Sequence, residues 1–294
     1  MVRNDLEENK KTSIFLIGDS LMADYPKDGY FPQQGWGKYF PEYFNKDIAN
    51  VYNTARGGES TSSFIKNPEL LEDRVLKRIT QGDIAVISLC HNDQFSTRIL
   101  AKKGREFVYI SDKRRYDSEI KNSMGDTSRG TDAVISVCPV GCDIKKYKEN
   151  LSFIADKIKE RNAFAVFVTE PNMGERMYIR DSYAKAMVDM AKEKKCDFFD
   201  LYTFHNKYIE KFFESDFITE HAKTKVPLFV QKQMFLYKLK ESGIITAEAQ
   251  KVHLNQSVRK TGTDLIHLSE SGAKMIAKWT ADNLKDSILK KFLL

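Results

Sequence analysis

The sequence predicts an α/β protein with a parallel β-sheet covered by helices on both sides. Apolar runs that are typical of buried strands recur along the chain, and segments with helical periodicity lie between them. Hydrophobic residues make up 41% of the 294 residues, which is enough for a sizeable core. We expect a single domain over residues 1–294, with insertions at about 95–144 and 202–262.

The first half of the predicted sheet holds three strands. Residues 13–18 form the first strand around the apolar run Ile14 to Ile17, and residues 48–53 form the second. Leucine, valine and isoleucine then recur at helical spacing, which predicts a helix over about 68–80. The third strand is the apolar run at 84–89.

Helices and strands continue to alternate in the second half of the chain. An amphipathic helix is predicted at 145–161, with Tyr147, Leu151, Ile154 and Ile158 on one face. The remaining predicted elements are a strand at 163–168, a helix at 178–194, a short strand at 197–201 and a helix from the N-cap Ser269 to about 289.

Two segments fall outside this alternation. Residues 95–144 are polar and basic with little periodicity, and loops this long are usually functional or disordered. Because this segment follows the third strand, it can fold over a cleft at the end of the sheet. Residues 202–262 have a mainly helical pattern around 208–213 and 226–242, and we expect a cap or an oligomer contact there.

Charge and hydropathy exclude several classes of function. The net charge is +6, but basic and acidic residues are interspersed, which predicts a solvated surface of mixed charge. No nucleic-acid motif is visible, and no apolar run is long enough to span a membrane. The charged N-terminus does not resemble a signal peptide, so we expect a cytoplasmic protein or a trimmed secreted one.

The four cysteines are Cys90, Cys138, Cys142 and Cys196. We expect reduced thiols, with a local disulfide between Cys138 and Cys142 as the alternative for an exported protein. We expect no metal site, because paired metal ligation would need more ligands than lie near these two cysteines. Cys90 ends an apolar strand and is expected to be a small buried residue.

A candidate nucleophile follows the first strand. Gly18-Asp19-Ser20-Leu21 would lift Ser20 out of the strand end, where ligand sites form in parallel sheets. A serine needs a histidine to take its proton and a carboxylate to orient that histidine. Asp264 and His267, three residues apart near the C-terminus, are the right residue types.

The attacked carbonyl also needs hydrogen-bond donors for its oxyanion. The candidate donors are the backbone N–H groups of Ser20 and Gly58 and the side-chain amide of Asn92. Each motif alone is a weak signal, because Gly-Asp-Ser, Gly-Gly and Asn-Asp are also common in turns. Their order along the chain, each after an apolar strand or before a helix, is what makes the catalytic interpretation specific.

These motifs resemble those of the GDSL, or SGNH, hydrolases, and most of all their carbohydrate-esterase branch, the rhamnogalacturonan acetylesterase-like enzymes. The motifs cover about residues 13–93 and 262–280. The matching blocks are Ile17-Gly18-Asp19-Ser20-Leu21-Met22-Ala23, Gln34-Gly35-Trp36-Gly37, Asn53-Thr54-Ala55-Arg56-Gly57-Gly58-Glu59-Ser60 with Ser63-Phe64, His91-Asn92-Asp93, and Asp264-Leu265-Ile266-His267-Leu268-Ser269 with Gly272-Ala273.

The resemblance implies a three-layer α/β/α sandwich with a short parallel sheet, of the flavodoxin-like type. It makes Ser20 the nucleophile, His267 the base and Asp264 the orienting acid, with an oxyanion hole formed by Ser20, Gly58 and Asn92. It implies no metal or organic cofactor. The chain departs from the branch at Cys90, where glycine is common, and at Glu59, where arginine is common, and both changes bear on the substrate.

Other residues have both a functional and a structural interpretation. His91, Trp36 and Glu59 are candidates for substrate binding, but Trp is mostly buried on average, which favours packing for Trp36. Asp19 is expected to hold the nucleophile turn. Glu170 ends the fourth strand on the cleft side, either touching substrate or closing a turn. The spare candidates for the base are His205, His221 and His253.

The main hypothesis is a serine esterase that removes acetyl groups from a carbohydrate, with a pectin- or rhamnogalacturonan-derived oligosaccharide as the expected substrate. The expected partners are this acetylated carbohydrate, with no nucleic acid and no membrane. One alternative is a lipolytic esterase or thioesterase with the same catalytic groups. Another is a non-catalytic carbohydrate-binding protein that kept the fold.

Overall fold

The computed structural model describes residues 11–25, 34–94, 98–103, 106–110, 133–138, 141–171, 181–214, 268 and 270–294. Its centre is a five-stranded parallel sheet with the strand order β2-β1-β3-β7-β8. The strands are β1 (Thr12–Gly18), β2 (Ala49–Asn53), β3 (Ile84–Ser88), β7 (Phe164–Val168) and β8 (Asp197–Phe199). All five predicted strands are confirmed, each to within two residues at either end.

The sheet is buried on both faces because the middle of each central strand is a continuous apolar run, such as Ile14 to Ile17 in β1 and Ile84 to Ile87 in β3. Along β1, Ile14 and Leu16 enter one hydrophobic cluster, whereas Phe15 and Ile17 enter the other. Side chains of a strand alternate between the two faces, so each face needs its own layer of helices. The fold is therefore the three-layer α/β/α sandwich that the sequence predicts.

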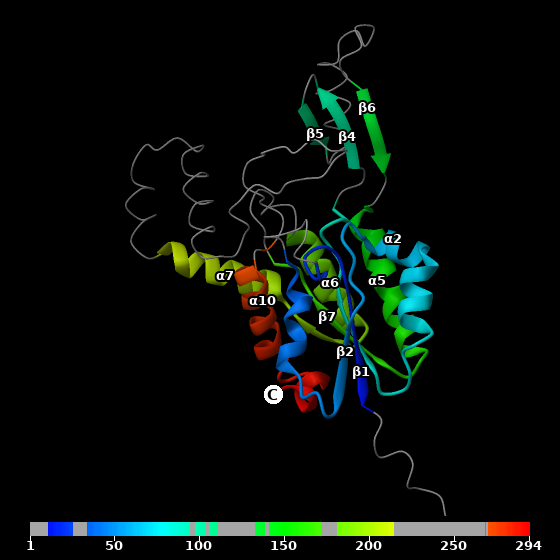
Figure 1. The fold of residues 1–294 in the computed structure, drawn as a ribbon, viewed down its shortest axis with the longest axis vertical. Helices are drawn as coiled ribbons and strands as arrows, with labels where there is room; N and C mark the ends of the chain where they lie inside the picture. The colour runs from blue at the N-terminus through cyan, green and yellow to red at the C-terminus, as the bar shows by residue number, and fades with distance from the viewer. Residues whose placement is uncertain are drawn as a thin grey trace, which may run out of the picture.

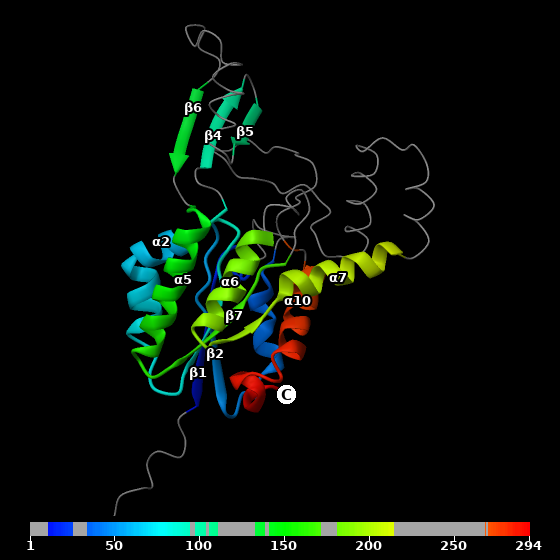
Figure 2. The ribbon, with the colours of Figure 1, turned by 180° about the vertical axis from the view of Figure 1, so that it is seen from behind.

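Helices from different parts of the chain cover the two faces (Figures 1 and 2). One face carries α2 (Thr61–Lys66), the π-helix η3 (Glu69–Leu76), α5 (Ile144–Lys159) and α6 (Asp181–Glu193). The other face carries the 3-10 helices η1 (Trp36–Lys38), η2 (Phe40–Tyr43) and η7 (Ile288–Phe292) together with α7 (Leu201–Glu214) and α10 (Glu270–Asn283).

Two of these helices differ from the predicted ones, one in helix type and the other in where it ends. The segment predicted as a helix over 68–80 is a π-helix, in which Lys77 N donates to Glu72 O, five residues earlier, at 2.9 Å. The spacing of its apolar residues alone cannot distinguish an α-helix from a π-helix. The final helix ends at Asn283, and a separate 3-10 helix follows, whereas the sequence predicts one helix to about 289. The predicted N-cap Ser269 lies outside the described residues.

The first insertion contains regular structure that the sequence analysis did not predict. The strands β4 (Arg98–Lys103), β5 (Glu106–Ile110) and β6 (Ala133–Cys138) form an antiparallel sheet in the order β5-β4-β6. Figures 1 and 2 place this sheet beyond the end of the main sheet at which β1 finishes. The sequence analysis found little periodicity in 95–144 and predicted no strand there, because each of these strands is only five or six residues long and gives a short pattern.

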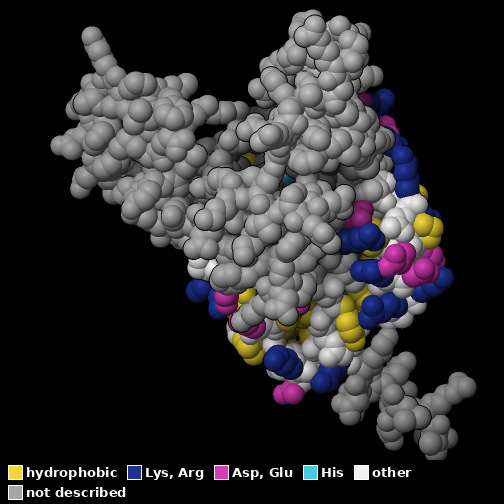
Figure 3. Space-filling model, turned by 45° about the horizontal axis from the view of Figure 1, so that its top comes forward, with side chains coloured by type: hydrophobic (Ala, Val, Ile, Leu, Met, Phe, Trp, Pro, Cys, Tyr) yellow, Lys and Arg dark blue, Asp and Glu magenta, His cyan; other side chains and the backbone are white. Residues whose placement is uncertain are grey.

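The second insertion begins with α7, which agrees with the helical pattern predicted from residue 208 onward. The other predicted helix, at 226–242, lies outside the described residues. On the described surface, Lys, Arg, Asp and Glu side chains are interspersed, as Figure 3 shows for the face that it draws. Lys157 on α5 and the C-cap residue Glu160, for example, form an ion pair at 2.8 Å, which fits the predicted surface of mixed charge.

Asp83 anchors the end of the sheet opposite the motifs. Its buried carboxylate accepts hydrogen bonds from Ser13 N at 2.8 Å and from Thr80 N and Oγ1 at 2.8 and 2.9 Å. Replacing Asp83 with alanine should lower the free energy of unfolding by about 2–4 kcal/mol, because buried donors lose their acceptor. Urea denaturation measures this change, and the matched control Asp73→Ala, at an exposed ion pair with Lys77, should change it little.

Candidate active site

Three connections meet at the carboxyl edge of neighbouring strands. Ser20 follows β1, Gly57 and Gly58 follow β2, and the segment His91-Asn92-Asp93 follows β3. Because β1 lies between β2 and β3, the three connections leave the sheet side by side. The structure therefore brings together the candidate nucleophile and the candidate oxyanion donors, at the edge where parallel sheets form their sites.

A tight turn held by Asp19 presents Ser20. The buried Asp19 carboxylate accepts from Leu21 N at 2.9 Å, and its carbonyl accepts from Met22 N and Ala23 N at 3.1 and 2.9 Å. Ser20 thus lies within a turn whose backbone is fixed from both sides. Asp19 has the structural role expected for it.

The Gly-Trp-Gly segment packs against the back of this turn. Trp36 N donates to Leu21 O at 2.8 Å. A Cβ atom at Gly35 would lie 2.2 Å from Ala23 O, and one at Gly37 would lie 2.4 Å from Met22 O. Only glycine permits this approach. The Trp36 ring is fully buried and forms a T-shaped pair with Phe40, so its position favours packing over stacking on a sugar.

The loop after β2 brings backbone close to Ser20. Gly58 has a φ of 85°, in the left-handed region that favours glycine. A Cβ atom at Gly57 would lie 2.8 Å from Tyr25 Oη and 3.9 Å from Ser20 Cβ. The loop is tied to β1 by Arg56 N, which donates to Gly18 O at 3.1 Å. Bare backbone therefore lines the site beside Ser20.

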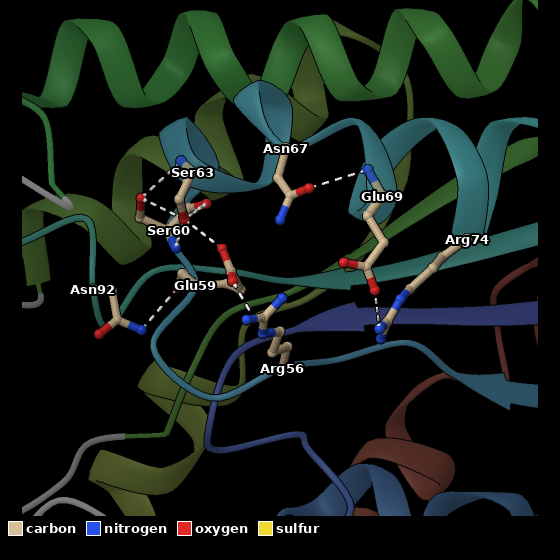
Figure 4. Close-up of polar contacts among 8 residues, drawn as sticks. All are labelled: Arg56, Glu59, Ser60, Ser63, Asn67, Glu69, Arg74 and Asn92. Atoms are coloured by element: carbon tan, nitrogen blue, oxygen red, sulfur yellow. Dashed lines mark hydrogen bonds and ion pairs between the residues drawn. The ribbon is translucent and has the colours of Figure 1, made fainter.

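The side-chain amide of Asn92 joins these two connections. Asn92 is fully buried, and its Nδ2 donates to Glu59 O at 2.8 Å (Figure 4) and to Asp19 Oδ2 at 3.3 Å. Donors at this point are suited to stabilise an oxyanion formed by attack from Ser20. The neighbouring His91 is also buried, with 3% of its surface exposed.

Glu59 is held by its own loop and by the start of α2. Its Oε2 accepts from Ser63 Oγ at 2.6 Å, and its Oε1 lies 3.7 Å from Nε of the half-exposed Arg56, as Figure 4 shows. Ser60 and Ser63 form a capping box at the N-terminus of α2. The negative charge of Glu59 is thus partly offset by the nearby Arg56. The sequence analysis missed this pair because it considered Glu59 without its neighbours in the loop.

A second polar group, behind Asn92, was not predicted. The buried Asp93 carboxylate contacts the first residue of α2, Thr61, and the thiol of Cys142. Burial raises the pKa of Asp93 to about 6, and the nearby Asp19 charge acts in the same direction, although bonds from Thr61 and Cys142 oppose it. The sequence at Asn92-Asp93 indicates only a turn, so it did not predict that the Asp93 carboxylate is buried.

The described cysteines and Glu170 lie in surroundings that suit a structural role. Cys90, Cys142 and Cys196 carry free thiols, whereas the Cys138 side chain lies outside the described part. Burial, followed by the Asp93 charge, raises the pKa of Cys142 to about 12. The buried Glu170 accepts from Cys90 N at 3.1 Å and so ties the end of β7 to the connection after β3.

The predicted base and its orienting acid, His267 and Asp264, lie outside the described residues, as do the spare candidates His221 and His253. Leu268, which follows His267 in the sequence, is fully buried, and its carbonyl accepts from Gln34 N at 3.0 Å. His205 is buried on α7, with its ring 5.8 Å from that of Trp279.

Neither a metal site nor a membrane span is found where the structure is described. Within those ranges, no group of three or more His, Cys, Asp or Glu side chains is placed to hold a metal ion. The helices described in full are too short or too polar to cross a membrane.

Residues 16–223 match the model of the GDSL-like lipase/acylhydrolase family, and the chain belongs to that family. It is 34% identical over 137 residues to the rhamnogalacturonan acetylesterase RhgT of Bacillus subtilis, a match covering 40% of this chain and 57% of that protein. It is 33% identical over 81 residues to the uncharacterized esterase YxiM of the same species, a match covering 28% of this chain and 21% of that protein.

The crystal structure of protein YxiM from Bacillus subtilis has a similar fold. The TM-score is 0.55 at 17% identity, with 94% of this chain and 57% of that chain covered. The chain thus spans less than two thirds of the length of these relatives. The family predicted from the motifs is confirmed, and the structural likeness supports the fold.

Proposed function

We propose that this protein is a serine esterase that removes acetyl groups from a carbohydrate. The observation that carries the proposal is the placement of Ser20 in a fixed turn beside the Gly57-Gly58 backbone and the Asn92 amide. Membership of an acylhydrolase family and the likeness to a rhamnogalacturonan acetylesterase support it.

In the proposed mechanism, Ser20 Oγ attacks the acetyl carbonyl carbon while its proton passes to His267, which Asp264 orients. The tetrahedral intermediate collapses, the bond to the sugar oxygen breaks, and His267 returns the proton to that oxygen. Water then attacks the acetyl-Ser20 ester and gives a proton to His267. Acetate leaves, and Ser20 Oγ takes the proton back.

The oxyanion would be stabilised by the backbone N–H groups of Ser20 and Gly58 and by Asn92 Nδ2. The bond from Asn92 to Asp19 is the longer of its two, 3.3 Å against 2.8 Å to Glu59 O. We therefore expect the oxyanion to share the N–H that is directed at Asp19, while the bond to Glu59 O keeps the planar amide in place.

The proposed substrate is an acetylated oligosaccharide derived from rhamnogalacturonan or a related pectin. This substrate class comes from the named activity of the relative at 34% identity. Glu59 and His91 are the proposed substrate contacts. Arg56 lies beside Glu59 and is half-exposed, so it adds a cation that an acidic sugar could approach.

Hydrolysis of 4-nitrophenyl acetate and 4-nitrophenyl octanoate tests the acyl preference. An acetylesterase should have a kcat/KM for the acetate ester that is at least about tenfold higher than for the octanoate ester, because a small acyl pocket excludes the longer chain. A preference for octanoate would instead support a lipolytic esterase or thioesterase. An inactive parent that binds the oligosaccharide would support the non-catalytic alternative.

A further inference from the structure

We propose that Thr61, Asp93 and Cys142 form a buried network that positions Asn92 for oxyanion binding. In this network Asp93 and Cys142 are positioning residues, which act on the reaction through Asn92. The inference rests on the proposed function, because it takes Asn92 as an oxyanion donor.

The first part of the network fixes Asn92 and Asp93 to one loop at two points. Asn92 Nδ2 donates to Glu59 O at 2.8 Å. Two residues further along that loop, Thr61 N donates to Asp93 Oδ2 at 2.9 Å and Thr61 Oγ1 donates to Asp93 Oδ1 at 2.5 Å. Because Asn92 and Asp93 are consecutive, these contacts set their orientation relative to Gly58.

The Thr61 hydroxyl is itself held in the required direction. Asn150 Nδ2, on α5, donates to Thr61 Oγ1 at 3.0 Å and to Ser62 Oγ at 2.9 Å. The hydroxyl oxygen therefore accepts from Asn150, and its proton is directed to Asp93. This arrangement links the segment Asn92-Asp93 to α2 and α5, two helices of the main core.

Cys142 holds Asp93 from the other side. Its backbone N–H donates to Asp93 O at 3.0 Å, and its thiol donates to Asp93 Oδ1 at 3.3 Å. The strands β4, β5 and β6 all lie between these two residues in the sequence. The two ends of the inserted segment are thus joined directly beside Asn92.

The protonation states of the Cys142 thiol and the Asp93 carboxylate suit this network near neutral pH. The pKa of Cys142 is raised to about 12 by burial and the Asp93 charge, so the thiol keeps its proton and remains a donor. The pKa of Asp93 is raised to about 6, mainly by burial, so the carboxylate is mostly ionised and accepts these bonds.

A double-mutant cycle tests the proposal on the full chain with 4-nitrophenyl acetate. Asn92→Ala should lower kcat about 100-fold or more, and Cys142→Ala about three- to tenfold with KM unchanged, because the lost contact acts in the transition state. In the Asn92→Ala background, Cys142→Ala should lower kcat no further, because its effect passes through Asn92. Cys142→Ser, which keeps a donor, should recover part of the loss.

Values of kcat are expressed per folded molecule, taken from unfolding curves, so that lost stability alone does not change them. Cys196→Ala is the matched control, since Cys196 is a buried thiol just before β8, and it should leave kcat unchanged. A Cys142→Ala variant with the parent kcat, or an equal loss in both backgrounds, would overturn the inference while the oxyanion role of Asn92 stands. An unchanged kcat in Asn92→Ala would overturn both.

Discussion

Replacing Ser20 with alanine is expected to lower kcat for acetyl-ester hydrolysis by at least about 10⁴-fold, with the fold retained. The hydroxyl is the proposed nucleophile, so the variant cannot form the acyl-enzyme at this position. The turn should survive, because its hydrogen bonds come from the Asp19 side chain and from backbone atoms. Steady-state kinetics with 4-nitrophenyl acetate measures the loss.

Ser88→Ala is the matched control for this experiment. Ser88 is a buried serine at the end of the neighbouring strand β3, and its hydroxyl has no hydrogen-bond partner in the described part of the chain. It should keep the parent kcat to within about twofold, as removal of one unbonded hydroxyl changes little. If Ser20→Ala retained the parent rate while Ser88→Ala lost it, Ser20 could not be the nucleophile.

Replacing His267 with alanine should be nearly as severe, with kcat lowered by about 10⁴-fold, since Ser20 would lose the base that takes its proton. The neighbouring Leu268 supports this proposal, because Leu268 O accepts from Gln34 N. Gln34 is followed by Gly35, which packs against the backbone of the nucleophile turn. Leu268, the residue after the proposed base, is therefore anchored to the segment that packs against the nucleophile turn.

The control for His267 is His205→Gln, which changes a buried histidine of α7 that packs against Trp279. It can lower the melting temperature, but its kcat should stay within about threefold of the parent. Circular dichroism establishes that each variant is folded before its rate is compared. A large loss in His205→Gln combined with an active His267→Ala would assign the base to α7.

The main sheet was predictable because its central strands contain short continuous apolar runs, such as Ile84 to Ile87, which are typical of buried parallel strands. The meeting of Ser20, Gly58 and Asn92 was predictable for a related reason. Parallel strands place all their carboxyl ends at one edge, so residues that follow adjacent strands become neighbours.

The contacts of Asp93 were not predictable in the same way. Thr61 and Cys142 lie 32 and 49 residues from Asp93 in the sequence, and no periodic pattern connects them. The pair Arg56 and Glu59 also depends on the shape of one loop rather than on residue type. Such side-chain contacts follow from tertiary packing, which a single sequence does not encode as a local signal.

Release of acetate from acetylated rhamnogalacturonan oligosaccharides, compared between the parent and Ser20→Ala, tests the central claim most directly. The account predicts that the parent releases acetate, that Ser20→Ala does not, and that the sugar chain keeps its length. A parent that releases no acetate from these oligosaccharides, yet hydrolyses 4-nitrophenyl octanoate faster than the acetate ester, would contradict a carbohydrate acetylesterase.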